Sequence, residues 1–338
     1  MKNARPLPPA KQRLTGFISR EFPETEEEHP LIRLAGDAST REYFRYLAGP
    51  GESFILTVYP EAFDPLHFDY RQVHDLLRGI GLPVPEMISL DGELGIVLQQ
   101  DLGDESLQKH LDGATKSERR ALLFKSIDYI VVLQQQGTNA LTPGHQASSL
   151  AFDEEKLNGE LAFFHRHYLG DYRNLKIDEE EFLREEFTRL SSELASAARL
   201  LCHRDYQVRN LMLKEGQVYI IDFQDARLGP VSYDLASLLK DSIQLEADEI
   251  SECRDYYLDQ ASRQFGHSVP KDFNRQFHLM CIQRLLKALG TYGHQISVRG
   301  QSVYRQYVQG SLQRALLSLQ AIPEFPYIQS IVEQELNS

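Results

Sequence analysis

Apolar and polar residues alternate over residues 33–98 in a way that predicts mainly strands and turns. Two pairs of short apolar runs are each separated by a turn signal, which is the pattern of a β-hairpin. Between the two pairs, apolar residues recur at near-helical spacing and predict one helix over residues 66–79. The paired runs are 41–47 with 54–59 and 87–90 with 94–98, and their turns are Gly49-Pro50-Gly51 and Asp91-Gly92.

After residue 103 the apolar residues recur mostly at helical spacing. Thr115-Lys116-Ser117-Glu118 has the form of a capping box and predicts the start of a helix. Further helices are predicted over residues 153–198 and from residue 266 onward, and a polar loop is predicted over residues 137–149. The apolar faces that we expect to be buried are Leu123, Ile127, Ile130 and Val131 in the first helix, and Leu279, Ile282, Leu285, Leu286 and Leu289 in the last.

The chain is therefore predicted to have an α+β architecture of two lobes. We expect residues 1–100 to form a small, β-rich N-terminal lobe and residues 101–338 to form a larger, mainly helical C-terminal lobe. The length of 338 residues agrees with this division, because at roughly 150 residues per domain it predicts about two domains.

Composition and charge narrow the class of protein. The chain is 42% hydrophobic and 25% charged, which is typical of a folded globular protein and excludes a disordered one. Its net charge of −13 disfavours nucleic acid and anionic membranes as partners, although a local cationic pocket could still bind a small anion. Cys202, Cys253 and Cys281 are widely spaced, so we expect buried thiols in a reducing compartment. With no signal peptide and no long apolar segment, the sequence predicts a cytoplasmic protein.

One segment carries a recognisable pattern of catalytic residue types. It contains His203-Arg204-Asp205, with Asn210 five residues after the aspartate, and then a short apolar hairpin that ends in Asp222. This spacing matches the catalytic loop and the metal-binding aspartate of protein kinases. Phosphoryl transfer needs a carboxylate near the acceptor hydroxyl and Mg²⁺ near the transferred phosphate, and Mg²⁺ prefers hard oxygen ligands. We therefore expect Asp205 to accept or orient the hydroxyl proton, and Asn210 and Asp222 to bind the metal.

A structural interpretation of the same residues is the alternative. Asp205 and Asn210 would then be turn-forming residues, and Asp222 would simply end a strand. That interpretation needs several coincidences of spacing within a chain that is already predicted to have two lobes. We favour the catalytic interpretation.

With these residues in place, the chain resembles the superfamily of aminoglycoside phosphotransferases and choline kinases, whose fold is similar to that of protein kinases. It has no G-x-G-x-x-G-x-V loop, no Asp-Phe-Gly and no Ala-Pro-Glu, so a protein kinase is not expected. It is more similar still to the bacterial anomeric N-acetylmuramate/N-acetylglucosamine kinases of cell-wall recycling. The segments that carry the resemblance are 36–41 with 43–45, 100–103, 203–205 with 209–212, 222–226, Gly229-Pro230, 233–239, and Gln283-Arg284 with Lys287.

The resemblance implies ATP-dependent phosphorylation of a sugar at its anomeric hydroxyl. ATP and Mg²⁺ are the cofactors that it implies, and a small sugar is the expected partner. We also expect no nucleic-acid partner, no membrane partner and a monomeric chain.

The expected nucleotide site departs from the protein-kinase pattern. The strand 54–59 has no lysine, and carries Thr57 instead, and the helix that follows has no partner glutamate. We expect Arg41, with Ser39 and Thr40, to contact the phosphates instead. Arg45 shares a strand face with Arg41 and is interpreted as a surface residue. The remaining nucleotide contacts are expected from backbone at the lobe junction and from an apolar floor below the adenine: Gln99, Gln100, Asp101, Leu102, Leu213 and Ile221.

The expected acceptor site draws on charged residues around the motif. Besides Asp205, we expect Arg209 and Asp225 to contact the sugar, and a structural salt bridge is the alternative for Arg209. Arg284 and Lys287 are three residues apart on the helix face away from the leucine stripe. They could bind the lactyl carboxylate of N-acetylmuramate, and a solvated basic face is the alternative.

Two neighbouring residues are expected to have structural roles. His203 is interpreted as a residue that braces the loop, not as a base. Asp234 is expected either to cap a helix or to brace the catalytic loop.

Two other functions stay open. The chain could phosphorylate an aminoglycoside, an amino alcohol or another sugar, although Arg209 and the Arg284/Lys287 pair argue mildly against a polycationic acceptor. It could also be a nucleotide-binding pseudokinase, which the missing strand lysine favours faintly. The catalytic residue types that a pseudokinase would not need are intact: Asp205, Asn210 and Asp222.

Overall fold

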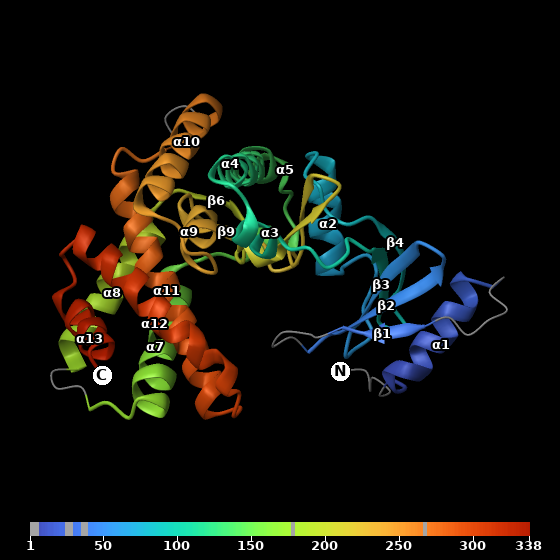
Figure 1. The fold of residues 1–338 in the computed structure, drawn as a ribbon, viewed down its shortest axis with the longest axis horizontal. Helices are drawn as coiled ribbons and strands as arrows, with labels where there is room; N and C mark the ends of the chain where they lie inside the picture. Colours follow the sequence, from blue (N-terminus) through green and yellow to red (C-terminus); the bar gives the residue numbers. More distant parts are fainter. Residues whose placement is uncertain (1–6, 24–29, 35–39, 177–179, 266–268) are drawn as a thin grey trace. The chain divides into compact units, whose positions relative to one another are not determined.

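The structure is a computed structural model, and it describes residues 7–23, 30–34, 40–176, 180–265 and 269–338 (Figure 1). By its internal contacts, the chain divides into two compact units. The first unit comprises Met1–Glu105 and Met212–Gln224, and the second comprises Ser106–Leu211 and Asp225–Ser338.

The first unit is built on a five-stranded antiparallel sheet with the strand order β1-β2-β3-β5-β4. Helix α1 (Ala10–Glu21) places Leu14 and Phe17 in a core with apolar residues of β2, β3 and β5. Both hairpins predicted from the sequence are present, and the predicted helix begins at Asp69. The elements are β1 (Leu31–Arg33), β2 (Glu42–Gly49), β3 (Glu52–Val58), α2 (Asp69–Gly79), β4 (Met87–Asp91) and β5 (Ile96–Gln100).

A second small hairpin belongs to this unit, although it lies far along the chain. It consists of β7 (Leu211–Lys214) and β8 (Gln217–Ile220), and Asp222 follows it. The backbone N–H of Leu213 donates to the carbonyl of Glu105, and that of Ile220 donates to the carbonyl of Pro83. The sequence assigns these residues to the second lobe, but their hydrogen bonds join them to the first unit.

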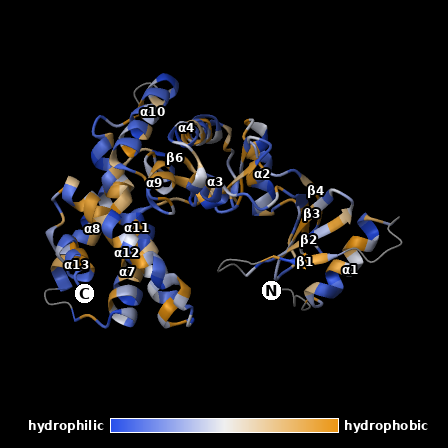
Figure 2. Cartoon of the chain, viewed as in Figure 1, coloured by the Kyte–Doolittle hydropathy of each residue, from blue (hydrophilic) through white to orange (hydrophobic). Residues whose placement is uncertain are grey.

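The second unit is mainly helical, and hydrophobic and hydrophilic stretches alternate along its helices (Figure 2). Its strands β6 (Arg199–Cys202) and β9 (Arg227–Pro230) form a small antiparallel sheet. Its helices are α3 (Leu107–Gly113), α4 (Lys116–Val132), η1 (Leu133–Gly137), α5 (Thr138–Ala140), α6 (Gln146–Ser149), α7 (Glu154–Phe164), η2 (His165–Tyr172), α8 (Glu180–Ser196), η3 (Val208–Asn210), α9 (Tyr233–Lys240), α10 (Ala247–Phe265), α11 (Phe273–Ser297), η5 (Ser302–Tyr304), α12 (Arg305–Ala321) and α13 (Pro326–Leu336).

The helix signals of the sequence are confirmed where they are local. The Thr115 side chain accepts from the Glu118 N–H and the Glu118 side chain accepts from the Thr115 N–H, so the capping box is formed. The expected apolar faces of α4 and α11 are buried. The predicted polar loop over residues 137–149 is wrong in part, because it contains the short helices α5 and α6 and buries Ala147.

Two other sequence expectations can be compared with the structure. The three cysteines are free and buried, as predicted. Within the described residues, the structure contains no helix whose length and apolar character would let it span a bilayer.

Candidate active site

The loop that is predicted to be catalytic, residues 203–210, begins where β6 ends, and its backbone is strained. Arg204 has φ 84°, a left-handed conformation that is unfavourable for a residue with a Cβ. The buried Asp234 carboxylate accepts from the N–H groups of His203 and Arg204, at 2.7 and 3.1 Å. The buried Arg284 donates from Nη1 to the Arg204 carbonyl at 2.8 Å. The strained peptide is therefore held by hydrogen bonds on both of its sides.

These contacts decide the structural roles expected for His203 and Asp234. The His203 Nδ1 accepts from the Asp205 N–H at 3.3 Å, and the ring is only 2% exposed, so His203 braces the loop as predicted. Asp234 is confirmed as a brace of the same loop. It does not cap a helix, because the N-cap of α9 is Ser232. Burial raises the pKa of Asp234. The two N–H donors and the nearby cations lower it, but they offset the effect of burial only in part.

The Asp205 carboxylate lies among cations. Burial opposes its ionisation, but the charges of Lys287, Arg204 and Arg284 outweigh burial and hold the pKa of Asp205 well below its usual range. The Lys287 Nζ is 3.8 Å from Oδ1, and the Arg204 Nε is 3.9 Å from Oδ2. The side chain keeps 26% exposure, so an acceptor hydroxyl can reach it.

The orientation of the Asn210 side chain is fixed by a hydrogen bond from its amide nitrogen, which leaves the amide oxygen available. The Asn210 Nδ2 donates to the Asp205 carbonyl at 2.8 Å, across the loop. With the NH₂ group committed to that bond, the oxygen is the atom that this amide offers to a cation. An amide oxygen of this kind is a hard ligand and fits Mg²⁺.

Asp225 takes part in an ion-pair chain in the second unit. Its Oδ1 is 3.1 Å from Arg204 Nη1 and 3.8 Å from Arg227 Nη2, and the side chain is half exposed. Sequence reasoning did not single out Arg204 or Arg227. The signal that could have found Arg204 is its place between His203 and Asp205.

Arg284 and Lys287 do not share an exposed face, and this expectation is wrong for Arg284. The Arg284 side chain is 2% exposed and stacks 4.4 Å from the Tyr233 ring. Its guanidinium is bound by Asp241, by the Ser237 hydroxyl and by the Arg204 carbonyl. Those bonds commit the donors of Arg284 to the protein, so it is a support of the catalytic loop.

The two other cations expected at the acceptor, Lys287 and Arg209, are accessible to solvent. Lys287 is 23% exposed, and Arg209 is exposed. The charge of Arg209 acts on Tyr292, whose pKa is raised mainly by burial. Sequence reasoning gave no role to this tyrosine.

Asp222, in the first unit, is bound by two donors. Its φ is 62°, again left-handed for a residue with a Cβ. The Arg41 Nη2 lies 3.2 Å from Asp222 Oδ1, and the Gln224 Nε2 donates to the same oxygen at 3.0 Å. The carboxylate is 40% exposed. Thr40 is exposed, and Ser39 lies outside the described residues.

Arg45 is not a surface strand residue, and that expectation is wrong. Its side chain is 16% exposed, with Nε 2.6 Å from Asp101 and Nη2 2.9 Å from Asp104. The Ser53 hydroxyl and the Gly103 N–H also donate to Asp101. The Asp101 carboxylate is thus a structural acceptor that ties β2 and β3 to the end of β5.

The residues expected near the adenine have defined backbone and side-chain contacts. The Gln99 side chain accepts from the Tyr70 hydroxyl at 2.6 Å, and the Gln100 N–H donates to the Glu86 carbonyl at 2.8 Å. The Asp101 carbonyl accepts from Lys214 Nζ at 2.8 Å. Leu102 is buried, while Leu213 and Ile221 are partly exposed. The roles of these residues toward a nucleotide stay predictions.

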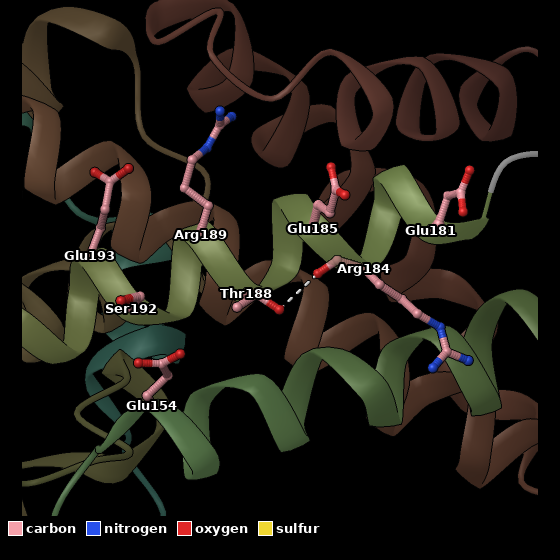
Figure 3. A pocket seen from close by; sticks show the side chains of 8 residues that line it. All are labelled: Glu154, Glu181, Arg184, Glu185, Thr188, Arg189, Ser192 and Glu193. Carbon is pink, nitrogen blue, oxygen red and sulfur yellow. Dashed lines mark hydrogen bonds between the residues drawn. The ribbon is translucent and has the colours of Figure 1, made fainter.

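An open groove of about 610 Å³ in the second unit lies apart from the predicted residues (Figure 3). Figure 3 shows that its lining comes mainly from α8, with Glu154 contributed by α7. None of the residues predicted for the site lines it. The lining residues are Glu154, Glu181, Arg184, Glu185, Thr188, Arg189, Ser192 and Glu193.

A sequence profile described as the phosphotransferase enzyme family matches residues 30–273 of the chain. The chain belongs to the phosphotransferase enzyme family. This membership agrees with the resemblance carried by residues 36–287, and it covers both units.

Two curated relatives of this phosphotransferase are named N-acetylmuramate/N-acetylglucosamine kinase. The protein of Neisseria meningitidis serogroup B is 30% identical over 301 residues, which cover 87% of this chain and 86% of the relative. The protein of Pseudomonas aeruginosa is 32% identical over 270 residues, which cover 78% of this chain and 75% of the relative.

Solved structures share the fold of this phosphotransferase at low identity. A choline/ethanolamine kinase family protein from Mesorhizobium loti has a TM-score of 0.62 and 15% identity, covering 96% of this chain and 100% of that chain. The ADP-bound aminoglycoside phosphotransferase APH(2'')-Ib has a TM-score of 0.55 and 14% identity, covering 90% and 97%. The predicted α+β, kinase-like fold is confirmed.

Proposed function

We propose that this phosphotransferase transfers the γ-phosphate of ATP to the anomeric hydroxyl of N-acetylmuramate or N-acetylglucosamine. The observation that carries the proposal is the near-full-length match to relatives of that name, at 30% identity over 87% of this chain for the Neisseria protein. A cation beside the catalytic carboxylate also suits an acceptor that carries a carboxylate of its own, as N-acetylmuramate does. ATP as the donor makes the cytoplasm the proposed place of action.

Asp205 is proposed to orient the acceptor hydroxyl. Because its pKa is held well below the usual range, the carboxylate has a low affinity for a proton and is a weak general base. It can still accept a hydrogen bond from the hydroxyl and direct the oxygen lone pair at the γ-phosphorus. In the loose transition state of phosphoryl transfer, such positioning contributes more than early proton removal.

Asn210 and Asp222 are proposed to hold Mg²⁺. Both offer a hard oxygen, which fits the preference of this ion, and both are fixed by neighbouring hydrogen bonds. When bound, Mg²⁺ would neutralise the phosphate charge that builds up as the phosphoryl group is transferred.

The remaining proposed contacts divide between donor and acceptor. Arg41, with Thr40 and Ser39, would bind the phosphates, and the backbone near residues 99–102 would receive the adenine above Leu213 and Ile221. Arg209, Asp225 and Lys287 would contact the sugar. Arg284 is not among them, because the protein itself occupies its donors.

The test is direct detection of the product. Purified protein, Mg-ATP and either amino sugar are incubated and followed by ³¹P NMR, and a new anomeric phosphate signal is expected. Asp205→Asn should lower kcat by roughly 10²-fold or more while ATP binding is retained. Asp112→Asn, an exposed residue on α3, serves as the matched control and should leave kcat unchanged.

Other outcomes redirect the proposal. ADP formation without an anomeric phosphate signal, or ATP binding with both sugars inert, would overturn the proposed acceptor and move the search to amino alcohols and aminoglycosides. A near-normal kcat in Asp205→Asn would contradict the role of the aspartate.

A further inference from the structure

Arg41 occupies an unusual place for a phosphate-binding cation. It stands one residue before β2, and its guanidinium contacts the carboxylate that is proposed to bind the metal, at 3.2 Å from Asp222 Oδ1. The side chain is 17% exposed and lies over the rings of Tyr43 and Tyr59, at 5.9 and 6.0 Å. Two aromatic rings within this distance stabilise the cation in this position.

Tyr59, which lies next to Arg41, does not carry a negative charge that would compete with Asp222 for the guanidinium. Burial raises the pKa of Tyr59 to about 12, and the charge of Arg41 opposes that rise only in part. The tyrosine is therefore a neutral neighbour at physiological pH. The ion pair between Arg41 and Asp222 is then the main pairing of opposite charges that the first unit shows at this place.

The arginine within β2, Arg45, is bound quite differently. Arg45 is held by the two structural carboxylates of Asp101 and Asp104, neither of which is a proposed metal ligand. Arg41 instead bonds a carboxylate that is exposed enough, at 40%, to take a metal ion. The strand 54–59 supplies no lysine, and Arg41 is the cation that is expected to contact the nucleotide phosphates in its place.

We propose that Arg41 is an internal counter-ion that exchanges Asp222 for the nucleotide phosphates. In the ligand-free protein it neutralises Asp222, and when Mg-ATP binds it moves to the phosphates and leaves the carboxylate to the metal. The inference rests on the proposed function, since it takes Asp222 as the metal ligand.

A consequence is that metal and nucleotide bind with positive coupling. A divalent cation alone must approach a carboxylate that already carries a guanidinium, and the two positive charges repel each other. A nucleotide removes this obstacle, because its phosphates attract Arg41. By linkage, the factor by which nucleotide tightens metal binding equals the factor by which metal tightens nucleotide binding.

The test measures binding, without turnover. Mn²⁺ is titrated by EPR into the wild type and Arg41→Gln, with and without the nonhydrolysable nucleotide AMP-PNP. We expect Arg41→Gln to bind Mn²⁺ alone about 5- to 10-fold more tightly than the wild type. We also expect it to bind AMP-PNP in EDTA about 10-fold more weakly, so that the coupling factor falls. Arg33→Gln, an exposed arginine on β1, is the matched control and should match the wild type.

Three further variants make the result specific. Arg41→Lys keeps the charge and should stay close to the wild type in its weak binding of Mn²⁺ alone, which a merely structural effect would not explain. Asp222→Asn is measured alone and combined with Arg41→Gln. In this background Arg41→Gln should no longer tighten the binding of Mn²⁺, because the metal ligand is lost. Melting temperatures of all variants confirm that each one is folded.

Two contrary results would overturn the counter-ion, and a third would bear only on the proposed acceptor. Equal Mn²⁺ affinity in the wild type and in folded Arg41→Gln overturns the counter-ion, even if the amino sugars are phosphorylated. A gain that persists in the Asp222→Asn background places the ion elsewhere and overturns it as well. Failure of both sugars in the NMR assay would contradict the proposed acceptor and leave the binding result standing.

Discussion

The carboxylate of Asp205, the proposed catalytic residue, is kept ionised by neighbouring cations. Burial alone would raise the pKa of Asp205, and Lys287 contributes most to the opposing attraction. In the proposed mechanism Asp205 acts as a carboxylate, so activity that depends on it is lost as pH falls through its pKa. Because that pKa is held well below its usual range, kcat/KM of the wild type should not fall between pH 8 and 5 on account of Asp205.

Lys287→Gln tests this assignment. Removal of the lysine lets the pKa of Asp205 rise, so the pH at which protonation of Asp205 lowers kcat/KM should move upward. At pH 7.5, kcat/KM should fall about 10-fold for N-acetylmuramate and less for N-acetylglucosamine, which has no carboxylate for the lysine to bind. The measurement is a pH–rate profile with both sugars, and Lys271→Gln, an exposed lysine, is the control. Equal kcat/KM values of Lys287→Gln and the wild type at pH 7.5, with both sugars, would contradict the role of Lys287.

The residues that sequence spacing could identify are those whose chemistry is local to the loop. The distance along the chain from Asp205 to Asn210 and the hairpin that leads to Asp222 are visible in the sequence. The place of Arg284 is not, because helical spacing shows where a side chain points but not what covers it. The face of α11 opposite the leucines is also covered, and Gln283 and Arg284 are as buried as the leucines beside them.

Secondary structure was predictable at the level of elements where a signal is complete within a few residues. The two hairpins and the capping box of α4 are of that kind. The short strand β9 is not, because its form depends on distant partners. Gly229 lies in it, and a Cβ there would stand 2.7 Å from the Phe152 ring and 3.2 Å from the Cys202 sulfur. The same limit applies to the π-helix η2, which packs against α11.

Close packing between η2 and α11 yields a prediction about stability. A Cβ at Gly293 would lie 2.4 Å from the His167 carbonyl oxygen and 2.7 Å from the Tyr168 Cα, both of which are backbone atoms. Because backbone cannot rotate away as a side chain can, Gly293→Ala should lower the free energy of unfolding by about 2–3 kcal/mol. Chemical denaturation followed by circular dichroism measures this loss.

A second helical glycine is the control for this prediction. Gly159 lies within α7, where a Cβ would have no neighbouring atom within 4 Å, and its φ is not left-handed. Gly159→Ala should therefore stabilise the protein by about 0.5–1 kcal/mol, since alanine restricts the unfolded chain and favours helix. Equal effects of the two substitutions would show that the contact with η2 does not control stability.

At the scale of the whole molecule, the proposed contacts are divided between the two units. Arg41, Asp222 and the backbone near residues 99–102 belong to the first unit, whereas Asp205, Asn210 and Lys287 belong to the second. The chain crosses from one unit to the other at Leu211 and returns after Gln224. The order of the motifs in sequence therefore does not follow the division into units, which is why a single boundary at residue 100 could not describe it.

This division predicts which ligand protects which part of the chain. N-acetylglucosamine alone should slow hydrogen exchange in residues 203–210 and 284–292, in the second unit. Mg²⁺ with AMP-PNP alone should slow it in residues 40–59 and 212–224, in the first, and at Asn210, the proposed metal ligand in the second. At a ligand concentration of about 100 Kd, binding stabilises the native protein by about 2.7 kcal/mol. Exchange through openings that release the ligand should therefore slow by up to about 100-fold.

Hydrogen exchange measured by mass spectrometry tests this prediction, with sucrose as the control sugar that is not an acceptor. Protection of the first unit by the sugar alone would contradict the assignment of the acceptor contacts, because those residues lie outside that unit.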